Sequence, residues 1–492
     1  MPERPNILLI LSDQHNPHIA GYAGDPWIKT PALDRLASQA THFSAAYCQS
    51  PLCVPARYAL LSGLPVHRCR AWDNTSILSS GLVTLPGWLA KHGYATAAVG
   101  KMHFRGPEQM YGWQFRPYGD LVESSVTQHQ PDPPDTADGR SFNHAVGRFP
   151  FAGPTAIPES LLADEVVTTE SLAWLQEHQD LQPDQPWFFC ASYYRPHFPL
   201  TAPGRYVRHY LASSLECPAL PPGYPVALHP HDRFTVDDFN LLRFSEEDHR
   251  RALASYYASI TYLDACIGRL LQGLEQAGQL DHTYILYTSD HGDMAGEHGL
   301  WWKRTYYDAS ACVPLLVHAP GQRNPDRVAV PVEQIDLFPT FCDWAGVPAP
   351  EEIEGESLVP LLNGQPQQRR KRFARSALLG ERVVNRFRMV RDERWKYVDF
   401  PEAPARLFDL QHDPGEEHDL ISHPPVEAPL EELAHLACAG GTWEALAAGM
   451  AADKAAAPAI VKLGRGANQY RLPDGRVLDA DDHLYELARD GH

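Results

Sequence analysis

Two acidic residues and a histidine in this sequence could together bind a metal ion. Asp13 follows one apolar segment, and Asp290 follows a much later one and is succeeded at once by His291. In an open parallel sheet the ligand crevice lies outside the carboxyl ends of the strands, so residues far apart in the chain can converge there. With the amide oxygen of Gln14, these ligands would favour Ca²⁺, Mg²⁺ or Mn²⁺ over zinc. The alternative is that each acid only caps the helix after its strand.

A cysteine and an arginine lie close to the expected start of a short helix. Cys53 precedes Pro55, whose ring suits a first helical turn, and Arg57 follows within the helix, which should end before Gly63. The free N–H groups at such a start can hold a tetrahedral oxyanion, to which Arg57 would add a fixed positive charge. Cys53 could instead be a buried structural thiol, or a thiolate whose pKa the helix start lowers.

The sequence around Cys53 resembles that of a known enzyme family. Residues 52–57 read Leu-Cys-Val-Pro-Ala-Arg and residues 60–63 read Leu-Leu-Ser-Gly. This is similar to the Cys-x-Pro-x-Arg motif of the type I, formylglycine-dependent sulfatases of the alkaline phosphatase superfamily, and most to choline-sulfatase-like and arylsulfatase-like bacterial enzymes. The resemblance implies that Cys53 is oxidised to formylglycine by a formylglycine-generating enzyme during maturation.

Two further segments resemble elements of the same family. Gly100–His103 looks like its Gly-Lys-x-His element, and Lys101 and His103 alternate along an extended segment, so both can point into one pocket and neutralise a sulfuryl group. Asp73-Asn74 resembles a segment near the pocket of choline-sulfatase-like enzymes, which implies that Asn74 contacts the substrate.

The remaining family elements occur later in the chain. Arg195–Pro199 resembles the Pro-His-x-Pro element, whose histidine, here His197, would lie beside the leaving-group oxygen. Residues 288–299 resemble the second metal-binding block, which is followed by a lysine, here Lys303, that would partner His197. The resemblance covers roughly residues 5–420.

The implied metal site departs from the common family pattern at two positions. Many sulfatases have Asp-Asp where this chain has Asp13-Gln14, and Asn where it has His291, so one ligand charge is lost. We therefore expect a divalent metal, Ca²⁺ first, with Mn²⁺ and Mg²⁺ as alternatives. The expected ligands are Asp13, Gln14, the modified Cys53, Asp290 and His291.

The resemblance implies a sulfuric ester hydrolase that acts on a small sulfate monoester and releases sulfate and an alcohol or phenol. One hydroxyl of the hydrated formylglycine would attack sulfur while Asp290 accepts its proton. His197 would protonate the departing oxygen, and His103 would take the proton of the second hydroxyl. The cations that would balance the sulfuryl charge are Arg57, Lys101 and Lys303.

Two other functions stay open. The first is a phosphonate monoester or phosphodiester hydrolase of the same superfamily, which shares the nucleophile and an Asp/His metal site but carries uncharged residues where this chain has Lys101 and His103. The second is a non-catalytic binding protein with the sulfatase fold, although every implied catalytic position of this chain holds a competent residue type.

The elements that position these residues have the pattern of an α/β fold. Apolar runs alternate with helical patterns, as in a parallel sheet flanked by helices, and the resemblance implies an alkaline-phosphatase-like fold. A catalytic domain is expected at 1–375, and an α+β subdomain with an antiparallel sheet, plus the tail, at 376–492. Predicted strands of the first domain are 7–11, 95–99, 187–192 and 284–288, and predicted helices are 31–39, 55–61, 85–92, 163–178 and 245–277.

Composition excludes several classes of partner. The 492 residues include 42 Lys and Arg against 61 Asp and Glu, a formal charge of −19, so we expect no nucleic-acid or membrane partner. No early apolar run approaches the ~20 residues that span a bilayer, and no cleavage signal is visible, which indicates a cytoplasmic protein. Nine scattered cysteines without a CxxC pair argue against a disulfide framework. A homo-oligomer is left open.

Overall fold

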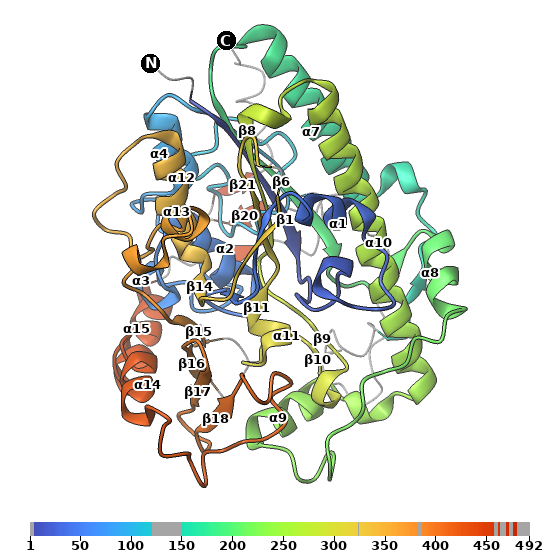
Figure 1. Cartoon of the computed structure of the whole chain (residues 1–492), viewed down its shortest axis with the longest axis vertical. Coiled ribbons are helices and arrows are strands. Elements are labelled where there is room, and N and C mark those ends of the chain that lie inside the picture. The colour runs from blue at the N-terminus through green and yellow to red at the C-terminus, as the bar shows by residue number, and fades with distance from the viewer. Residues whose placement is uncertain are drawn as a thin grey trace.

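The computed structural model of the chain describes residues 4–120, 149–322, 324–380, 386–456, 461–462, 469–471 and 476–479. A seven-stranded sheet runs through its centre (Figure 1). Its strands are β1 (Asn6–Asp13), β2 (Thr41–Phe43), β4 (Ala95–Gly100), β6 (Trp187–Pro196), β8 (Thr283–Ser289), β12 (Leu315–His318) and β13 (Asp326–Val328). They lie in the order β13-β2-β12-β8-β1-β6-β4. The expected α/β fold with a large, mostly parallel sheet is confirmed.

The four neighbouring strands β8, β1, β6 and β4 are parallel and in close register. Leu11 of β1 pairs with Ser192 of β6 on one side and with Thr288 of β8 on the other, and Gly100 of β4 also pairs with Ser192. The residues that follow these strands therefore meet at one edge of the sheet. This register explains how acids separated by more than half the chain come together.

Each face of the sheet is buried under its own set of helices. Leu8 and Ile10 of β1 enter one hydrophobic cluster, and Leu9 and Leu11 enter the other, as expected for a strand with period two. The first face is covered by α7 (Ala163–Leu181) and α10 (Glu246–Gln276), and the second by α2 (Cys53–Ser62), α4 (Leu85–Lys91) and α12 (Leu337–Ala345) (Figure 1).

The predicted start of α10 is confirmed in detail. Ser245 Oγ accepts the backbone N–H of Asp248 at 3.2 Å, and the Asp248 carboxylate accepts the backbone N–H of Ser245 at 3.0 Å, which is a capping box. The other helices are α1 (Pro31–Ala37), α3 (Val66–Cys69), α8 (Gly204–Leu211), α9 (Pro230–Asp238), α11 (Asp308–Ala311) and α13 (Val359–Leu362). Short strands are β3 (Ala46–Tyr47), β5 (Gly153–Pro154), β7 (Thr201–Ala202), β9 (Met294–Ala295), β10 (Trp301–Trp302), β11 (Cys312–Val313), β14 (Val332–Glu333), β19 (Val461–Lys462), β20 (Gln469–Arg471) and β21 (Val477–Asp479).

A four-stranded antiparallel sheet forms the expected C-terminal part. It comprises β15 (Ala374–Leu378), β16 (Phe387–Arg391), β17 (Trp395–Asp399) and β18 (Arg406–Asp409), and it is followed by α14 (Leu430–Ala437) and α15 (Trp443–Ala456). Strand β15 was not predicted from the sequence. The division expected between residues 375 and 376 falls inside this strand, and the domain boundary stays a prediction.

Two general properties of the chain bear on the expectations from composition. No helix in the described part of the chain is long and apolar enough to cross a membrane. All nine cysteines lie within the described ranges, and every one is an unpaired thiol.

Candidate active site

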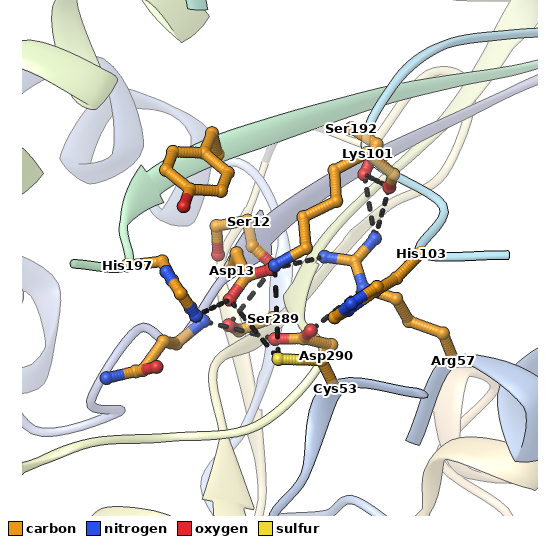
Figure 2. A network of polar contacts seen from close by, with 12 residues as sticks. Ser12, Asp13, Cys53, Arg57, Lys101, His103, Ser192, His197, Ser289 and Asp290 are labelled. Atoms are coloured by element: carbon orange, nitrogen blue, oxygen red, sulfur yellow. Dashed lines mark hydrogen bonds and ion pairs between the residues drawn. The ribbon is translucent and has the colours of Figure 1, made fainter. Parts of the chain in front are cut away.

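The sulfur of Cys53 lies at the centre of a buried polar cluster at the carboxyl edge of the parallel strands. It is 2.9 Å from Lys303 Nζ, 3.3 Å from His291 Nε2 and 4.0 Å from Asp13 Oδ1. All four side chains are 5% exposed or less. Lys303 therefore contacts Cys53 directly, and Figure 2 shows Asp13 and Cys53 pointing toward each other with the polar groups around them.

Helix α2 begins at Cys53, two residues earlier than the sequence predicts. The Asn74 side chain explains the difference, because its Oδ1 accepts the backbone N–H of Val54 at 3.0 Å and so satisfies one free donor of the first turn. Arg105 Nε in turn donates to the Asn74 carbonyl at 2.8 Å. Asn74 thus holds the helix that carries Cys53, and a contact of Asn74 with substrate stays a prediction.

Replacement of Asn74 by alanine should loosen this helix start. We expect Asn74→Ala to lower the free energy of unfolding by about 0.5–2 kcal/mol, since the N–H of Val54 loses its acceptor. Asn74→Asp keeps an acceptor oxygen and should retain most of that stability. Urea unfolding measures both. Unchanged stability with a raised KM in Asn74→Ala would instead assign Asn74 to substrate binding alone.

Arg57 lies beneath the two acids and binds both. Its Nε donates to Asp290 Oδ2 at 2.8 Å, and its Nη2 donates to Asp13 Oδ2 at 3.0 Å. Its Nη1 donates to Ser192 Oγ at 3.0 Å and to the carbonyl of Lys101. Since four donors of the fork are already engaged, Arg57 fixes the carboxylates, and its direct contact with a sulfuryl group stays a prediction.

Each acid turns one oxygen toward the cations and the other into the site. Asp13 Oδ2 accepts from Arg57 and lies 2.5 Å from Lys101 Nζ, while its Oδ1 faces Cys53. Burial and the neighbouring Asp290 oppose ionisation of Asp13, but the cations Lys101 and Arg57 outweigh them and lower its pKa to about 2. Burial is likewise outweighed at Asp290, chiefly by His291 and Arg57, and its pKa lies below its usual range. Both acids are therefore ionised at neutral pH.

These groups fit a divalent cation. Ligand atoms of Asp13, Cys53, Asp290 and His291 all lie within 4.8 Å of one another. His291 donates Nδ1–H to the Gly292 carbonyl at 2.9 Å, which turns Nε2 toward Cys53, the orientation in which the neutral ring would bind a metal through Nε2. The two carboxylate oxygens suit hard cations such as Ca²⁺, Mg²⁺ and Mn²⁺, whereas an imidazole nitrogen is a ligand more typical of transition metals.

Gln14 lies at the edge of the same pocket, held by a residue that the sequence did not identify. Its Nε2 donates to Asp293 Oδ2 at 2.8 Å, so its Oε1 turns inward and accepts Lys303 Nζ at 2.7 Å. Burial raises the pKa of Asp293 to about 8. Position 293 lies within residues 288–299, which resemble the second metal-binding block of the family, but that resemblance gave it no role of its own.

The two predicted acid–base histidines lie on opposite sides of the cluster (Figure 2). His197 donates Nδ1–H to the Phe198 carbonyl at 2.6 Å, and its Nε2 faces Asp13 Oδ1 at 3.9 Å. His103 receives a hydrogen bond on Nε2 from Arg105 Nη2 at 2.8 Å. Burial and the nearby lysines hold the pKa of both histidines well below the usual value, with Arg105 and Arg57 adding to the effect at His103, so both are neutral here.

The loop that carries His103 is fixed by an acid that the sequence did not identify. Asp120 accepts the backbone N–H groups of Met102 and His103, each at 2.8 Å. This contact stabilises the left-handed backbone of His103, whose φ is 60°. Asp120 lies in a stretch without hydrophobic periodicity, so no sequence pattern predicts that it binds the loop of His103.

The environment of Cys53 favours its ionised form. Burial and Asp13 act to raise the thiol pKa, but Lys101, Lys303 and His291 outweigh them and lower it to about 7. Lys101 Nζ is 3.9 Å from the sulfur. The pocket is thus built to hold negative charge at position 53.

Known proteins resemble this chain over most of its length. The family model described as Sulfatase matches residues 5–347, and that described as N-sulphoglucosamine sulphohydrolase, C-terminal, matches residues 296–436. Choline-sulfatase of Rhizobium meliloti (strain 1021) is 33% identical over 86% of this chain and 84% of its own length. Arylsulfatase K of Bos taurus is 28% identical over 88% and 81%. The solved phosphonate monoester hydrolase of Silicibacter pomeroyi superposes with a TM-score of 0.72 at 26% identity, over 88% of this chain and 94% of that one.

The fold and the buried acid–cysteine cluster define a hydrolase of the alkaline phosphatase superfamily. The chain belongs to the sulfatase family, because the Sulfatase model covers more than two thirds of it and a choline-sulfatase is one third identical along most of it. It is a sulfuric ester hydrolase, as the sequence motifs implied.

Proposed function

We propose that this sulfatase cleaves small sulfate monoesters with a formylglycine at position 53 as nucleophile. The observation that carries this assignment is the position of the Cys53 sulfur at the start of α2, within 2.9 Å of Lys303 and 3.3 Å of His291. A formylglycine-generating enzyme would act on Cys53 during maturation.

Membership of the sulfatase family implies two groups that would supply the reactive chemistry, a formylglycine and a divalent metal. When present, the hydrated aldehyde offers a hydroxyl nucleophile and the divalent metal polarises oxygen atoms in the pocket. The residues that would hold the metal are Asp13, Asp290, His291 and the converted residue 53, whose ligand atoms lie together, with Gln14 beside them. Ca²⁺ is the first choice, with Mn²⁺ and Mg²⁺ as alternatives.

Two lysines would hold the anionic group of the substrate. Lys101 and Lys303 approach the residue 53 side chain at 3.9 and 2.9 Å, and both are buried, so their charges act with little screening. Gln14 Oε1 orients the Lys303 ammonium by accepting from it. Together they balance the charge that develops on the sulfuryl oxygens.

Three side chains would handle protons. Asp290 is ionised and can accept the proton of the attacking hydroxyl. His197 has its Nδ1 fixed by the Phe198 carbonyl, so Nε2 is the atom that would serve the leaving oxygen, and a bound anion beside it would raise its pKa. His103 can accept a proton at Nε2 only after the hydrogen bond from Arg105 to that nitrogen breaks.

A phosphonate monoester hydrolase is the second candidate, favoured by the structural similarity to the Silicibacter pomeroyi enzyme. The buried ammonium of Lys101 favours the sulfate ester. We therefore expect an aryl sulfate to be turned over faster than a phenylphosphonate monoester. A large preference for the phosphonate would remove sulfate esters as the main substrate. Choline sulfate and a sulfated sugar in the same assay would show which kind of alcohol the substrate contains. Choline sulfate is included because a related protein is a choline-sulfatase.

Removal of the Lys101 charge should affect the sulfate reaction most. We expect Lys101→Ala to lower kcat/KM for the aryl sulfate by about 10²–10³-fold, because a fixed cation at the developing charge is lost. Lys91→Ala is the matched control, since Lys91 is exposed on α4 and should leave kcat/KM unchanged. Equal activity of Lys101→Ala and Lys91→Ala would exclude the role given to Lys101.

A further inference from the structure

The unconverted cysteine lies among metal ligands at spacings that suit zinc. Cys53 Sγ is 3.3 Å from His291 Nε2 and 4.0 Å from Asp13 Oδ1, and His291 Nε2 is 3.6 Å from Asp290 Oδ1. Ligands about 2.0–2.3 Å from one tetrahedral zinc ion lie about 3.3–3.8 Å from each other. A small contraction of this cluster would therefore complete a four-coordinate site.

The donor atoms also suit zinc rather than calcium. One sulfur, one imidazole nitrogen and two carboxylate oxygens are the ligand types found at zinc sites, whereas Ca²⁺ takes oxygen ligands. His291 already turns its Nε2 toward the cluster because Nδ1 donates to the Gly292 carbonyl. Asp290 Oδ1 is likewise held in place by the backbone N–H groups of Gln14 and His291, at 3.1 and 2.9 Å.

The surrounding cations fit a bound thiolate. A thiolate at Cys53 and the two carboxylates would carry three negative charges, one more than the same site with a neutral aldehyde at position 53. Lys303 Nζ lies 2.9 Å from the sulfur, at a distance from which it can donate to a metal-bound thiolate. Lys101 and Arg57 both bind Oδ2 of Asp13, so they leave Oδ1 available to a metal ion.

We propose that the chain with Cys53 still a thiol binds one Zn²⁺ through Cys53, Asp13, Asp290 and His291, with the thiol proton released to solvent. Conversion of Cys53 would then change the preference of the site from zinc to a hard divalent cation. The zinc site of the unconverted chain does not depend on sulfatase activity. The change of preference rests on the formylglycine of the proposed function.

The experiment uses full-length protein in which peptide mass analysis shows Cys53 as a thiol, freed of metal with a chelator. Co²⁺ serves as the probe, since sulfur bound to Co²⁺ gives a charge-transfer band in the near ultraviolet. We expect this band to saturate at one equivalent of Co²⁺, to vanish on addition of one equivalent of Zn²⁺, and to persist in excess Ca²⁺. A failed formylglycine assignment would leave these results unchanged.

Two variants separate Cys53 from the other thiols. Cys53→Ser should lose the band and bind Zn²⁺ at least about 10–100-fold more weakly, a loss at least as large as that for outer-shell partners of a metal. Cys438→Ser, at the one exposed cysteine of the nine, should behave as wild type. X-ray absorption at the zinc edge of the unvaried protein should show one sulfur at about 2.3 Å. The proposal would be overturned if that sulfur were absent, if Cys53→Ser bound Zn²⁺ as tightly as the wild type, or if Ca²⁺ displaced the bound Co²⁺.

Discussion

Cys53→Ala is expected to lower kcat/KM for an aryl sulfate by about 10⁴-fold or more, the scale seen when a covalent nucleophile is removed from an active site. The side chain at position 53 is the one that Lys101, Lys303 and His291 surround, so its removal leaves these groups without the nucleophile they are placed to serve. Steady-state kinetics with wild-type and variant enzyme measure the loss.

A second cysteine provides the matched control. Cys438→Ala changes an exposed thiol far along the chain, and its kcat/KM should equal that of the wild type. Thermal unfolding should show that both variants are folded. Sulfatase activity in Cys53→Ala at the wild-type level would mean that another group attacks sulfur.

Arg57→Met should have the second largest effect, on stability as well as on activity. It would leave Asp13 and Asp290 buried and ionised without the guanidinium that binds both of them. Breaking a buried ion pair from one side costs about 3–5 kcal/mol, so we expect a loss of that size in the free energy of unfolding. Activity should fall by at least about 10³-fold, because the two acids lose their fixed positions.

An exposed arginine gives the control for this variant. Arg35 pairs with Glu275 at 2.8 Å, but the two side chains are 62% and 46% exposed. Arg35→Met should therefore cost no more than about 1 kcal/mol and leave activity unchanged. Urea unfolding of the three proteins measures the difference. A similar loss in Arg57→Met and Arg35→Met would show that Arg57 does not hold the acids.

The sequence predicted those parts of the site that depend on local order and on strand direction. Asp13 ends one buried strand and Asp290 follows another that runs parallel to it, and parallel strands end at one edge, so their convergence could be foreseen. Cys53 and Arg57 share one helix, so their proximity follows from helical spacing. The family motifs implied that Lys303 belongs to the same pocket, although they did not indicate its contact with Cys53.

The remaining features depend on contacts between distant segments, which no local pattern encodes. Arg57 was expected at the sulfuryl oxygens, yet four of its donors are engaged by the protein. Asp120 and Asp293 act by holding His103 and Gln14, and acids in polar loops have no distinctive spacing. Asn74 lies far enough from α2 in sequence that its capping contact becomes visible only in three dimensions.

Conversion of Cys53 is the central claim, and one paired measurement tests it most directly. Preparations made with different amounts of formylglycine-generating enzyme would be digested, and the mass of the peptide that contains residue 53 would give the fraction present as aldehyde. We predict that kcat for an aryl sulfate rises in proportion to this fraction and extrapolates to zero when all of residue 53 is cysteine. Full activity in protein whose residue 53 is entirely a thiol would contradict the account.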